Sequence, residues 1–428
     1  MNPQTLVVAE LSGVEGFYPF DRLHCVWEVR WGPWSLLQWW RRRFPETSIV
    51  GAVSPERRQW YYSFLKRFPE SCSAEVRLPA LVVDARLVPK SHTVGVLQQV
   101  WERSVTERTI LALYSEGELA ALILPTASLP PELLTLEQGI WTEECAAFSS
   151  ELPRVESFVP RLRFLWEAVT MLGEAFAEVE AVLTTGVEPR MWQQRGVWIL
   201  APERVQIAPT ADLAPGVVLD ARSGPVFIDE GAIIQPGAVL LGPCAIGVNA
   251  LVRAHATIGG YTVVGEGCRI GGEVAHSVFH AYANKQHEGF VGHSYVGEWV
   301  NLGAGTTTSN LKNTYGTVRL HLPWGEVDTG AQFLGTLCGD HTKTAIGTYL
   351  RTGAVIGISV NLLAGGMEAR FVPSFSWGHA AQPQPYQVGK ALEVARRVMA
   401  RRGRELLPEE EWLLRAEYER VWGVPRQN

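Results

Sequence analysis

Aliphatic residues recur at every sixth position along the middle of the chain. They are Ile228, Ile234, Leu240, Ile246, Val252, Ile258, Val264 and Ile270, without a gap. An α-helix repeats its apolar face every three to four residues and a β-strand every second residue, so a period of six fits neither. It is typical of a chain that bends after each short strand and stacks one aliphatic residue per bend into a central column. The stretch therefore predicts a hexapeptide β-helix.

The same period continues on both sides of this stretch. It includes Ile207, Leu213 and Leu219 before it, and Phe290, Val296, Leu302, Leu334, Ile346 and Ile358 after it. Three extra residues between Leu219 and Ile228 predict a bulge, while residues 276–289 and 307–328 break the phase. Loops ejected from a regular solenoid often carry its function. We therefore expect a β-helix over residues 205–380, with functional residues near the two interruptions.

Residues 1–190 alternate β-rich runs with stretches of helical character. The expected strands are 6–9, 48–53, 80–83 and 109–113, and the expected helices are 34–43, 55–68, 94–105 and 159–182. Such alternation predicts an α/β domain with parallel strands, whose carboxyl ends bind ligands. Asp84 follows the third strand, so it either caps a loop there or contacts a metal or substrate.

Residues 385–428 are expected to form helices. Ala391, Leu392 and Ala395 share one apolar helical face that arginines flank. Pro408 opens a second helix, at a position where its missing N–H costs nothing. We expect these helices to pack on the β-helix or on a neighbouring subunit. Contact of the arginines with an anionic ligand is the alternative.

Composition and charge exclude several classes of protein. The formal net charge of −6 argues against nucleic-acid binding. No apolar run reaches the roughly 18 residues that a membrane span needs, and the N-terminus lacks the features of a signal peptide. The six cysteines include no C-x-x-C pair, which indicates reduced thiols rather than a disulfide framework or a zinc site. We expect a cytoplasmic protein without membrane or nucleic-acid partners.

Four histidines, His276, His280, His287 and His293, lie close together around the first interruption. A β-helix has no room for a large internal pocket, so its ligands are expected outside, in a cleft between two neighbouring prisms. A histidine near its solution pKa can take a proton there at neutral pH. A lone histidine is more often structural, but four of them beside asparagines and a lysine make at least one catalytic histidine a reasonable expectation.

The segment HEGFVGHSYVGEWVNLGAGTTTSNLKNTYGTV resembles the acetyltransferase half of the bacterial bifunctional N-acetylglucosamine-1-phosphate uridyltransferase/glucosamine-1-phosphate acetyltransferase family. The stretches GDHTKTAIGT, FVPSFSWG and KALEVARRVMARRG resemble its divergent, sugar nucleotidyltransferase-like branch. The similarity extends over about residues 205–405. Over the first 190 residues it is weaker and rests on layout, RLHCVWEVRWGPWSLLQWW and VVDARLVP.

The resemblance implies three parts and an assembly. They are a nucleotidyltransferase-like α/β domain over residues 1–190, a left-handed parallel β-helix acyltransferase domain over 205–380, and helices over 385–428. It also implies a cytoplasmic homotrimer, because the active-site cleft needs two prisms.

Catalytic and acceptor-binding residues can be carried over from the family motifs. The family's general base, a histidine, stands fourteen positions before the motif N-[IL]-G-A-G, which points to His287. Two substrate-contacting asparagines, one opening that motif and one nine residues later, point to Asn301 and Asn310. An arginine that faces the sugar phosphate or the uridine corresponds to Arg253.

Two positions depart from the family pattern. The substrate-contacting tyrosine falls on Phe290, which removes its hydroxyl, and a phosphate-binding lysine falls on Ala275. Lys285 is the expected replacement for that lysine. These departures affect the identity of the acceptor more than the type of reaction.

The resemblance implies acetyl-CoA-dependent N-acetylation of an amino-sugar phosphate or a nucleotide amino sugar, as in UDP-N-acetylglucosamine biosynthesis. His287 would take a proton from the amine, which attacks the thioester carbonyl. The turn containing Gly303 and Ala304, together with Lys343, is expected to hold the acetyl-CoA. Backbone N–H groups of that turn can stabilise the oxyanion by about 3 kcal/mol.

The uridyltransferase reaction has weaker support. Where the family has the phosphate loop L-A-A-G-x-G-T-R-M, this chain reads VVAELSGVEGFYPF, without a glycine-rich loop followed by a basic residue. Uridyl transfer, with the Mg²⁺ that it requires, is therefore an open question for this domain.

Two other functions are compatible with the sequence. One is a catalytically silent scaffold that binds a sugar nucleotide. The other is a zinc hydratase of the trimeric β-helix type, in which three histidines hold the metal. The histidine spacing here does not match that of such enzymes, so no metal ligand is assigned.

Overall fold

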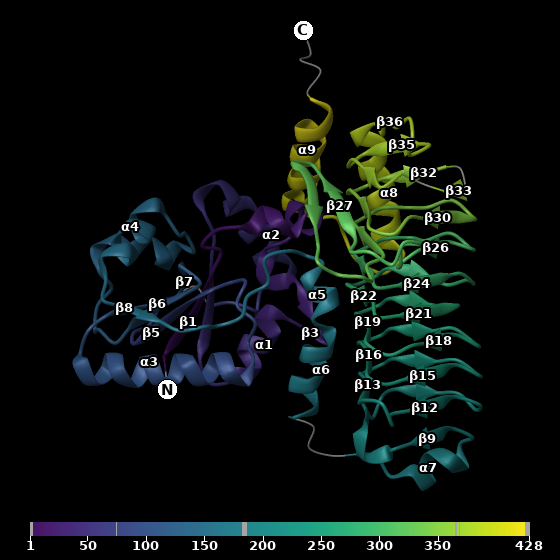
Figure 1. Ribbon diagram of the computed structural model, residues 1–428, viewed down its shortest axis with the longest axis horizontal. Helices are drawn as coiled ribbons and strands as arrows, with labels where there is room; N and C mark the ends of the chain where they lie inside the picture. Colours follow the sequence, from purple (N-terminus) through teal and green to yellow (C-terminus); the bar gives the residue numbers. More distant parts are fainter. Residues whose placement is uncertain (1–2, 74, 182–185, 364–365, 368, 424–428) are drawn as a thin grey trace.

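The computed structural model describes residues 3–73, 75–181, 186–363, 366–367 and 369–423. An α/β domain lies beside a tall β-helical prism, and two C-terminal helices lie at one end of the prism (Figure 1). The fold class expected from the sequence is confirmed: an α/β domain, a left-handed parallel β-helix and a helical tail.

The α/β domain is built on a six-stranded sheet with the strand order β4-β1-β5-β7-β6-β8. Strands β1 (Thr5–Ala9), β4 (Ser48–Ala52) and β5 (Ala80–Asp84) pair in parallel, as the alternation of strands and helices predicts. Strand β7 (Glu118–Leu124) has no counterpart in the sequence-based expectation. It runs antiparallel between β5 and β6 (Leu111–Ser115), and β8 (Arg154–Glu156) then pairs in parallel with β6.

Most helices of this domain form where they are expected. They are α1 (Leu36–Arg43), α2 (Arg58–Arg67), α3 (Ser91–Glu107) and α4 (Glu143–Glu151). The long helix expected over 159–182 is wrong, because it is two short helices, α5 (Glu167–Thr170) and α6 (Leu172–Glu180). The preceding backbone is extended instead, since Pro160 and Leu162 hydrogen-bond to residues 86–88. The last expected residue, 182, lies outside the described residues.

The prism has three faces. The first face is a parallel sheet of nine strands: β10 (Val205–Ile207), β13 (Val226–Ile228), β16 (Cys244–Ile246), β19 (Thr262–Val264), β22 (Val278–Phe279), β25 (Tyr295–Val296), β29 (Thr336–Cys338), β31 (Ala354–Ile356) and β34 (Phe371–Val372). The second face comprises β11 (Asp212–Leu213), β14 (Ile233–Ile234), β17 (Leu251–Val252), β20 (Arg269–Ile270), β23 (Asn284–Lys285), β32 (Asn361–Leu362), β35 (Ser376–Gly378) and β36 (Gln384–Pro385).

The third face begins after the short helix α7 (Pro189–Gln194). Its strands are β9 (Trp198–Leu200), β12 (Val218–Asp220), β15 (Val239–Leu241), β18 (Thr257–Ile258), β21 (Glu273–Ala275), β24 (Phe290–Gly292), β26 (Thr307–Thr308), β30 (Thr348–Leu350) and β33 (Gly366–Met367). One coil, with one strand on each face, is therefore the repeating unit, and the chain bends between faces.

The aliphatic column predicted from the period of six is confirmed. All eight residues from Ile228 to Ile270 are at most 2% exposed and belong to one core cluster inside the prism. The bulge is confirmed too. Ile207 pairs with Ile228, and Ile228 pairs with Ile246, on neighbouring coils, and more residues separate the first pair along the sequence than the second. The phase break after Ile270 is a shortened coil, in which Val264 pairs with Phe279.

Four expected column positions are wrong. Val291 occupies the core position assigned to Phe290, which lies half-buried outside the prism core. Ile346 is 77% exposed at a corner, while Leu334 and Ile358 pack outside the prism interior. After the long second loop the column restarts in a different phase, through Cys338, Leu350, Ile356 and Leu362.

The second interruption is an ejected loop with a β-hairpin. Strands β27 (Arg319–Leu322) and β28 (Gly325–Asp328) pair antiparallel, and Val318 and Leu320 join the core of the α/β domain. Trp324, in the turn, contacts Tyr18 edge-on with ring centroids 6.3 Å apart. This loop therefore helps to fix the domain to the prism.

The first face of the prism is the one that the α/β domain covers. Its outward residues, among them Val263, Val278 and Leu337, share one core cluster with Phe17 and Trp31 of the domain. The second and third faces keep exposed apolar side chains, such as Ile233, Leu241 and Tyr349. Two faces of the prism are therefore left largely open.

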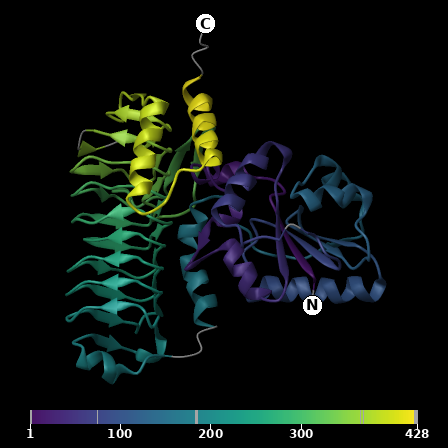
Figure 2. The ribbon, with the colours of Figure 1, turned by 180° about the vertical axis from the view of Figure 1, so that it is seen from behind.

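Helices α8 (Val388–Ala400) and α9 (Pro408–Trp422) pack on the prism, as expected. In Figure 2, α8 lies along the prism and α9 lies between the prism and the α/β domain. A small apolar cluster joins all three parts: Leu23, Ile358, Phe375, Leu392, Leu413 and Leu414. No described helix has the length and apolarity of a membrane span.

Candidate functional site

His287 lies at the corner between the second and third faces, directly after β23. Its side chain is exposed, and no described residue forms a hydrogen bond with its imidazole. The neighbouring Lys285 is different, because it points into the prism and is 2% exposed, in line with Ile270 of the preceding coil. Its ammonium group donates to the His287 carbonyl at 2.5 Å. Burial lowers the pKa of Lys285 to about 8, although Glu288 opposes the shift.

Asn301 is exposed on the second face, in a ladder with Asn284, Lys343 and Asn361 of neighbouring coils. Lys343 donates to the His341 carbonyl at 2.6 Å, and burial lowers its pKa to about 8. Asn284 accepts a hydrogen bond from Arg402 at 2.9 Å. The C-terminal segment thus reaches this ladder beside Asn301, and Tyr386 reaches it again at Asn361.

The glycine-rich turn after Asn301 has one backbone amide that is available for a ligand. The N–H of Gly303 donates to Thr344 Oγ1 and that of Gly305 donates to the Glu288 carbonyl, both at 3.0 Å. The Ala304 N–H has no partner among the described residues. Of these three amides, Ala304 is therefore the candidate for oxyanion stabilisation.

Asn310 and His293 form a separate group at the corner between the third and first faces. Asn310 Nδ2 lies 2.9 Å from His293 Nδ1. The His293 ring stacks between His276 and Phe333, at centroid distances of 4.4 and 5.2 Å. Burial, with a contribution from His276, lowers the pKa of His293 to about 4. The ring is therefore neutral and held in a stack.

Within one chain, these candidates do not converge on a common pocket. Phe290 is half-buried against Gly292, and Arg253 is exposed at the corner between the second and third faces. None of the residues assigned from the family motifs lines the cavity between the α/β domain and the prism. Residues of two corners can meet only if another surface completes the site.

Asp84, at the carboxyl end of β5, is fully buried and already paired. Its carboxylate accepts hydrogen bonds from Arg86 at 2.7 Å and from Arg161 at 3.2 Å. Both cations also pair with Glu118. Of the two roles left open for Asp84, the structure favours a structural one.

A cavity of about 360 Å³ lies where the α/β domain, the prism and the helical tail meet. Its walls include Arg30 and Arg67 from the domain, Tyr282 and Trp299 from the prism, and Arg404 from the tail. The Tyr282 and Trp299 rings are stacked 4.3 Å apart. The sequence gives little signal of this cavity, because its walls come from segments that are far apart in the chain.

A buried group of charged residues lies beside this cavity, and Glu28, Arg67 and Glu298 of the group line it. His24 Nε2 lies 2.6 Å from Asp340 Oδ2, and Arg67 contacts Glu28 at 2.5 Å. Burial opposes protonation of His24, but Asp340 and Glu28 outweigh it and raise the pKa of His24 to about 10. Burial also raises the pKa of Glu298 to about 7.

No protein-family model matches the chain. Its curated relatives include the bifunctional protein GlmU of Trichormus variabilis, 26% identical over 56% of this chain and 58% of that protein. The GlmU of a Nostoc species is 25% identical over 59% of this chain and 61% of that protein. In both cases the alignment covers less than two thirds of the relative.

Two further similarities are shorter or weaker. A bifunctional sugar-1-phosphate nucleotidylyltransferase/acetyltransferase of Sulfurisphaera tokodaii is 31% identical over 35% of this chain and 38% of its own length. A solved Bacillus cereus structure assigned as an acetyltransferase covers 52% of the chain at 12% identity, with a TM-score of 0.23, too low to carry an argument.

Proposed function

Because the chain is a divergent relative of the bifunctional GlmU proteins, we propose that it is an acetyl-CoA-dependent N-acetyltransferase. The proposed acceptor is an amino-sugar phosphate or a nucleotide amino sugar. The observation that carries the proposal is the exposed imidazole of His287, at the corner between the two faces that the α/β domain leaves open.

In the proposed reaction His287 acts as the general base. Its imidazole accepts a proton from the acceptor amine, whose nitrogen then attacks the thioester carbonyl of acetyl-CoA. The amide bond forms, the C–S bond breaks, and the imidazolium returns its proton to the sulfur, so that CoA leaves as a thiol. The unpaired N–H of Ala304 is suited to hold the oxyanion of the tetrahedral intermediate.

Acceptor recognition is assigned to Asn301 and Arg253, with Asn310 contributing across the cleft from a neighbouring prism. Lys285, the expected replacement for the phosphate-binding lysine, is left out because its side chain is buried inside the prism. Lys343, beside Asn301 on the second face, is assigned to CoA. Since the two groups lie at different corners of one prism, the proposed active species is a homotrimer, in which the open faces meet.

We propose that the α/β domain no longer transfers uridyl groups. Asp84 is compensated by Arg86 and Arg161, so it offers little attraction to Mg²⁺. The glycine-rich phosphate loop is absent from the sequence. The domain would then serve to cover the first face and to build the cavity at its edge.

The test is acceptor-dependent release of CoA from acetyl-CoA, measured with glucosamine-1-phosphate and with UDP-glucosamine. The proposal expects release with at least one of them. If both sugars bind but neither gives CoA release, the chain is a sugar-nucleotide-binding scaffold instead.

A further inference from the structure

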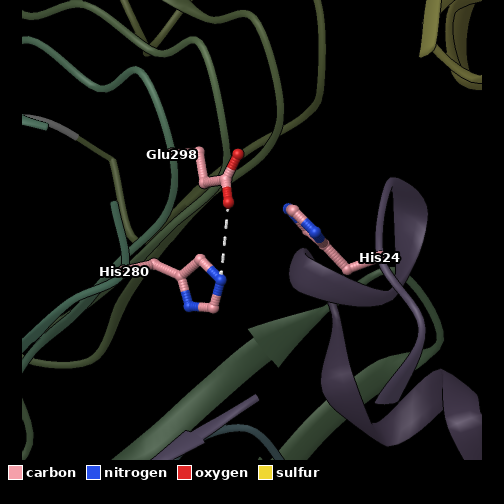
Figure 3. A group of neighbouring side chains, drawn as sticks. All are labelled: His24, His280 and Glu298. Atoms are coloured by element: carbon pink, nitrogen blue, oxygen red, sulfur yellow. Dashed lines mark ion pairs between the residues drawn. The ribbon is translucent and has the colours of Figure 1, made fainter. Parts of the chain in front are cut away.

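Three side chains with metal-binding atoms meet beside the cavity between the domains. His24 comes from the loop between two 3-10 helices, Phe20–Arg22 and Val26–Glu28, of the α/β domain. His280 and Glu298 come from successive coils of the prism. One nitrogen of each histidine and one oxygen of Glu298 lie within 4.8 Å of one another (Figure 3).

All three side chains are almost completely buried: His24 is 2%, His280 6% and Glu298 7% exposed. Polar groups at such depth are normally hydrogen-bonded, because desolvation is costly. The Glu298 carboxylate lines the cavity and forms no hydrogen bond among the described residues. Its closest partners are His280 Nε2 at 3.5 Å and Arg67 Nη1 at 3.7 Å, both longer than a normal hydrogen bond.

The two histidines are held as metal-binding histidines usually are, by a partner on the opposite ring nitrogen. His280 Nδ1 lies 3.0 Å from the Tyr295 hydroxyl, whose oxygen also accepts from the backbone N–H of Arg30. A proton on Nδ1 leaves the lone pair of Nε2 directed toward Glu298. In Figure 3 the His24 ring faces Glu298 across the same space.

The His24 ring has carboxylates on both sides. Nε2 contacts Asp340, and Nδ1 lies 3.3 Å from Glu28 Oε2 and 3.2 Å from Arg67 Nη2. Whichever nitrogen binds a metal, the other keeps a carboxylate partner that orients the ring.

Charge balance favours a cation here. Four carboxylates face this region, on Glu28, Glu298, Asp340 and Glu410, and Arg67 alone reaches three of them, at 2.5, 3.7 and 4.0 Å. A divalent cation here would add positive charge where a single guanidinium is shared among three carboxylates.

We propose that His24, His280 and Glu298 bind a first-row divalent cation, with Zn²⁺ as the best fit. Two imidazoles and one carboxylate match three-ligand zinc sites that keep an open position. Ligands at 2.0–2.1 Å from zinc lie about 3.4 Å apart, so modest side-chain rotation closes the set. The cavity, which His280 and Glu298 line, gives the ion an entry path and the open position a place for a ligand.

This proposal is independent of the acetyltransferase proposal and departs from the expectation of no metal ligand. Since His24 belongs to the α/β domain and the other two ligands to the prism, the ion would also fix the domain to the prism.

The full-length chain, stripped with a chelator and dialysed, is titrated with Zn²⁺ and, in parallel, with Co²⁺. The expected result is one tightly bound ion per chain and the visible absorption of low-symmetry Co²⁺. Glu298→Gln, nearly isosteric, is expected to weaken Zn²⁺ binding at least 100-fold, and His24→Gln should do the same. The matched control, Glu266→Gln, removes a carboxylate from the same cavity wall but outside the trio, and should bind as the wild type does.

The proposal would be overturned if the wild type and Glu298→Gln had the same affinity for Zn²⁺. The proposal would also be overturned if all variants bound the same number of ions and gave the same Co²⁺ spectrum. Exposed histidines such as His287 would then hold the metal. In either case the trio is an ion-pair contact between the domains. A melting temperature that Zn²⁺ raises in the wild type and in Glu266→Gln, but not in Glu298→Gln, gives the same answer without an activity assay.

Discussion

Replacing Lys285 with methionine is expected to stabilise the protein at neutral pH. Lys285 occupies an inward position next to the aliphatic column, 2% exposed. Burial lowers the pKa of Lys285 from 10.5 to about 8, so at pH 7 the protein folds with a charged amine in its core. At about 1.36 kcal/mol per pH unit, this costs roughly 3 kcal/mol.

Methionine has nearly the same length and needs no hydrogen bond. It loses the bond from Nζ to the His287 carbonyl, worth about 1 kcal/mol, and that carbonyl lies at an exposed corner where water can replace the donor. The expected net gain for Lys285→Met is therefore about 2 kcal/mol in the free energy of unfolding at pH 7.

The gain should disappear at high pH. Between pH 8 and 10.5 the unfolded chain binds more protons than the folded one, so the stability of the wild type rises with pH across this window. At pH 10 the cost of charging the buried Lys285 falls to about 1 kcal/mol, close to the value of the lost hydrogen bond.

The assay is denaturant unfolding at pH 7 and pH 10, with Lys390→Met on the exposed side of α8 as the control. The control should change stability by less than about 0.5 kcal/mol at either pH. A Lys285→Met protein that is less stable than the wild type at pH 7, or equally stabilised at both pH values, would refute the reasoning.

The other predictions concern assembly and the α/β domain. The chain should be a trimer by light scattering, and a stable wild-type mass near 47.3 kDa would count against the shared cleft. Ile346 lies at an exposed corner between the two open faces, so Ile346→Asp should weaken the trimer without unfolding the chain. The protein should release no pyrophosphate from UTP and N-acetylglucosamine-1-phosphate with Mg²⁺, and robust release would show that the Asp84 region still binds the metal.

Short-range periodicity made much of the prism predictable. The column from Ile228 to Ile270 depends only on neighbouring coils, so the sequence pattern and the packing carry the same information. The prediction failed after the ejected loop, because a loop of arbitrary length resets the phase, and Ile346 emerged at a corner. Strand β7 was missed because its residues, ELAALIL, are mostly alanine and leucine, which favour helices over strands.

The candidate sites differ in how much of each can be identified from the sequence alone. His287 and Asn301 lie in one short segment, so motif spacing alone is enough to name them as candidates. The group of His24, His280 and Glu298 forms only when the α/β domain docks on the first face of the prism. No local spacing encodes that contact, and the sequence-based search for metal ligands could not find it.

The central claim is that His287 is the base in acetyl transfer, and turnover of two histidine variants tests it most directly. His287→Ala should lower kcat for CoA release by about 10²- to 10⁴-fold and leave the KM for acetyl-CoA nearly unchanged. His293→Ala, which removes a ring from the stack with His276 and Phe333, should lower thermal stability more than turnover. A folded His293→Ala trimer without turnover, beside an active His287→Ala enzyme, would contradict the account.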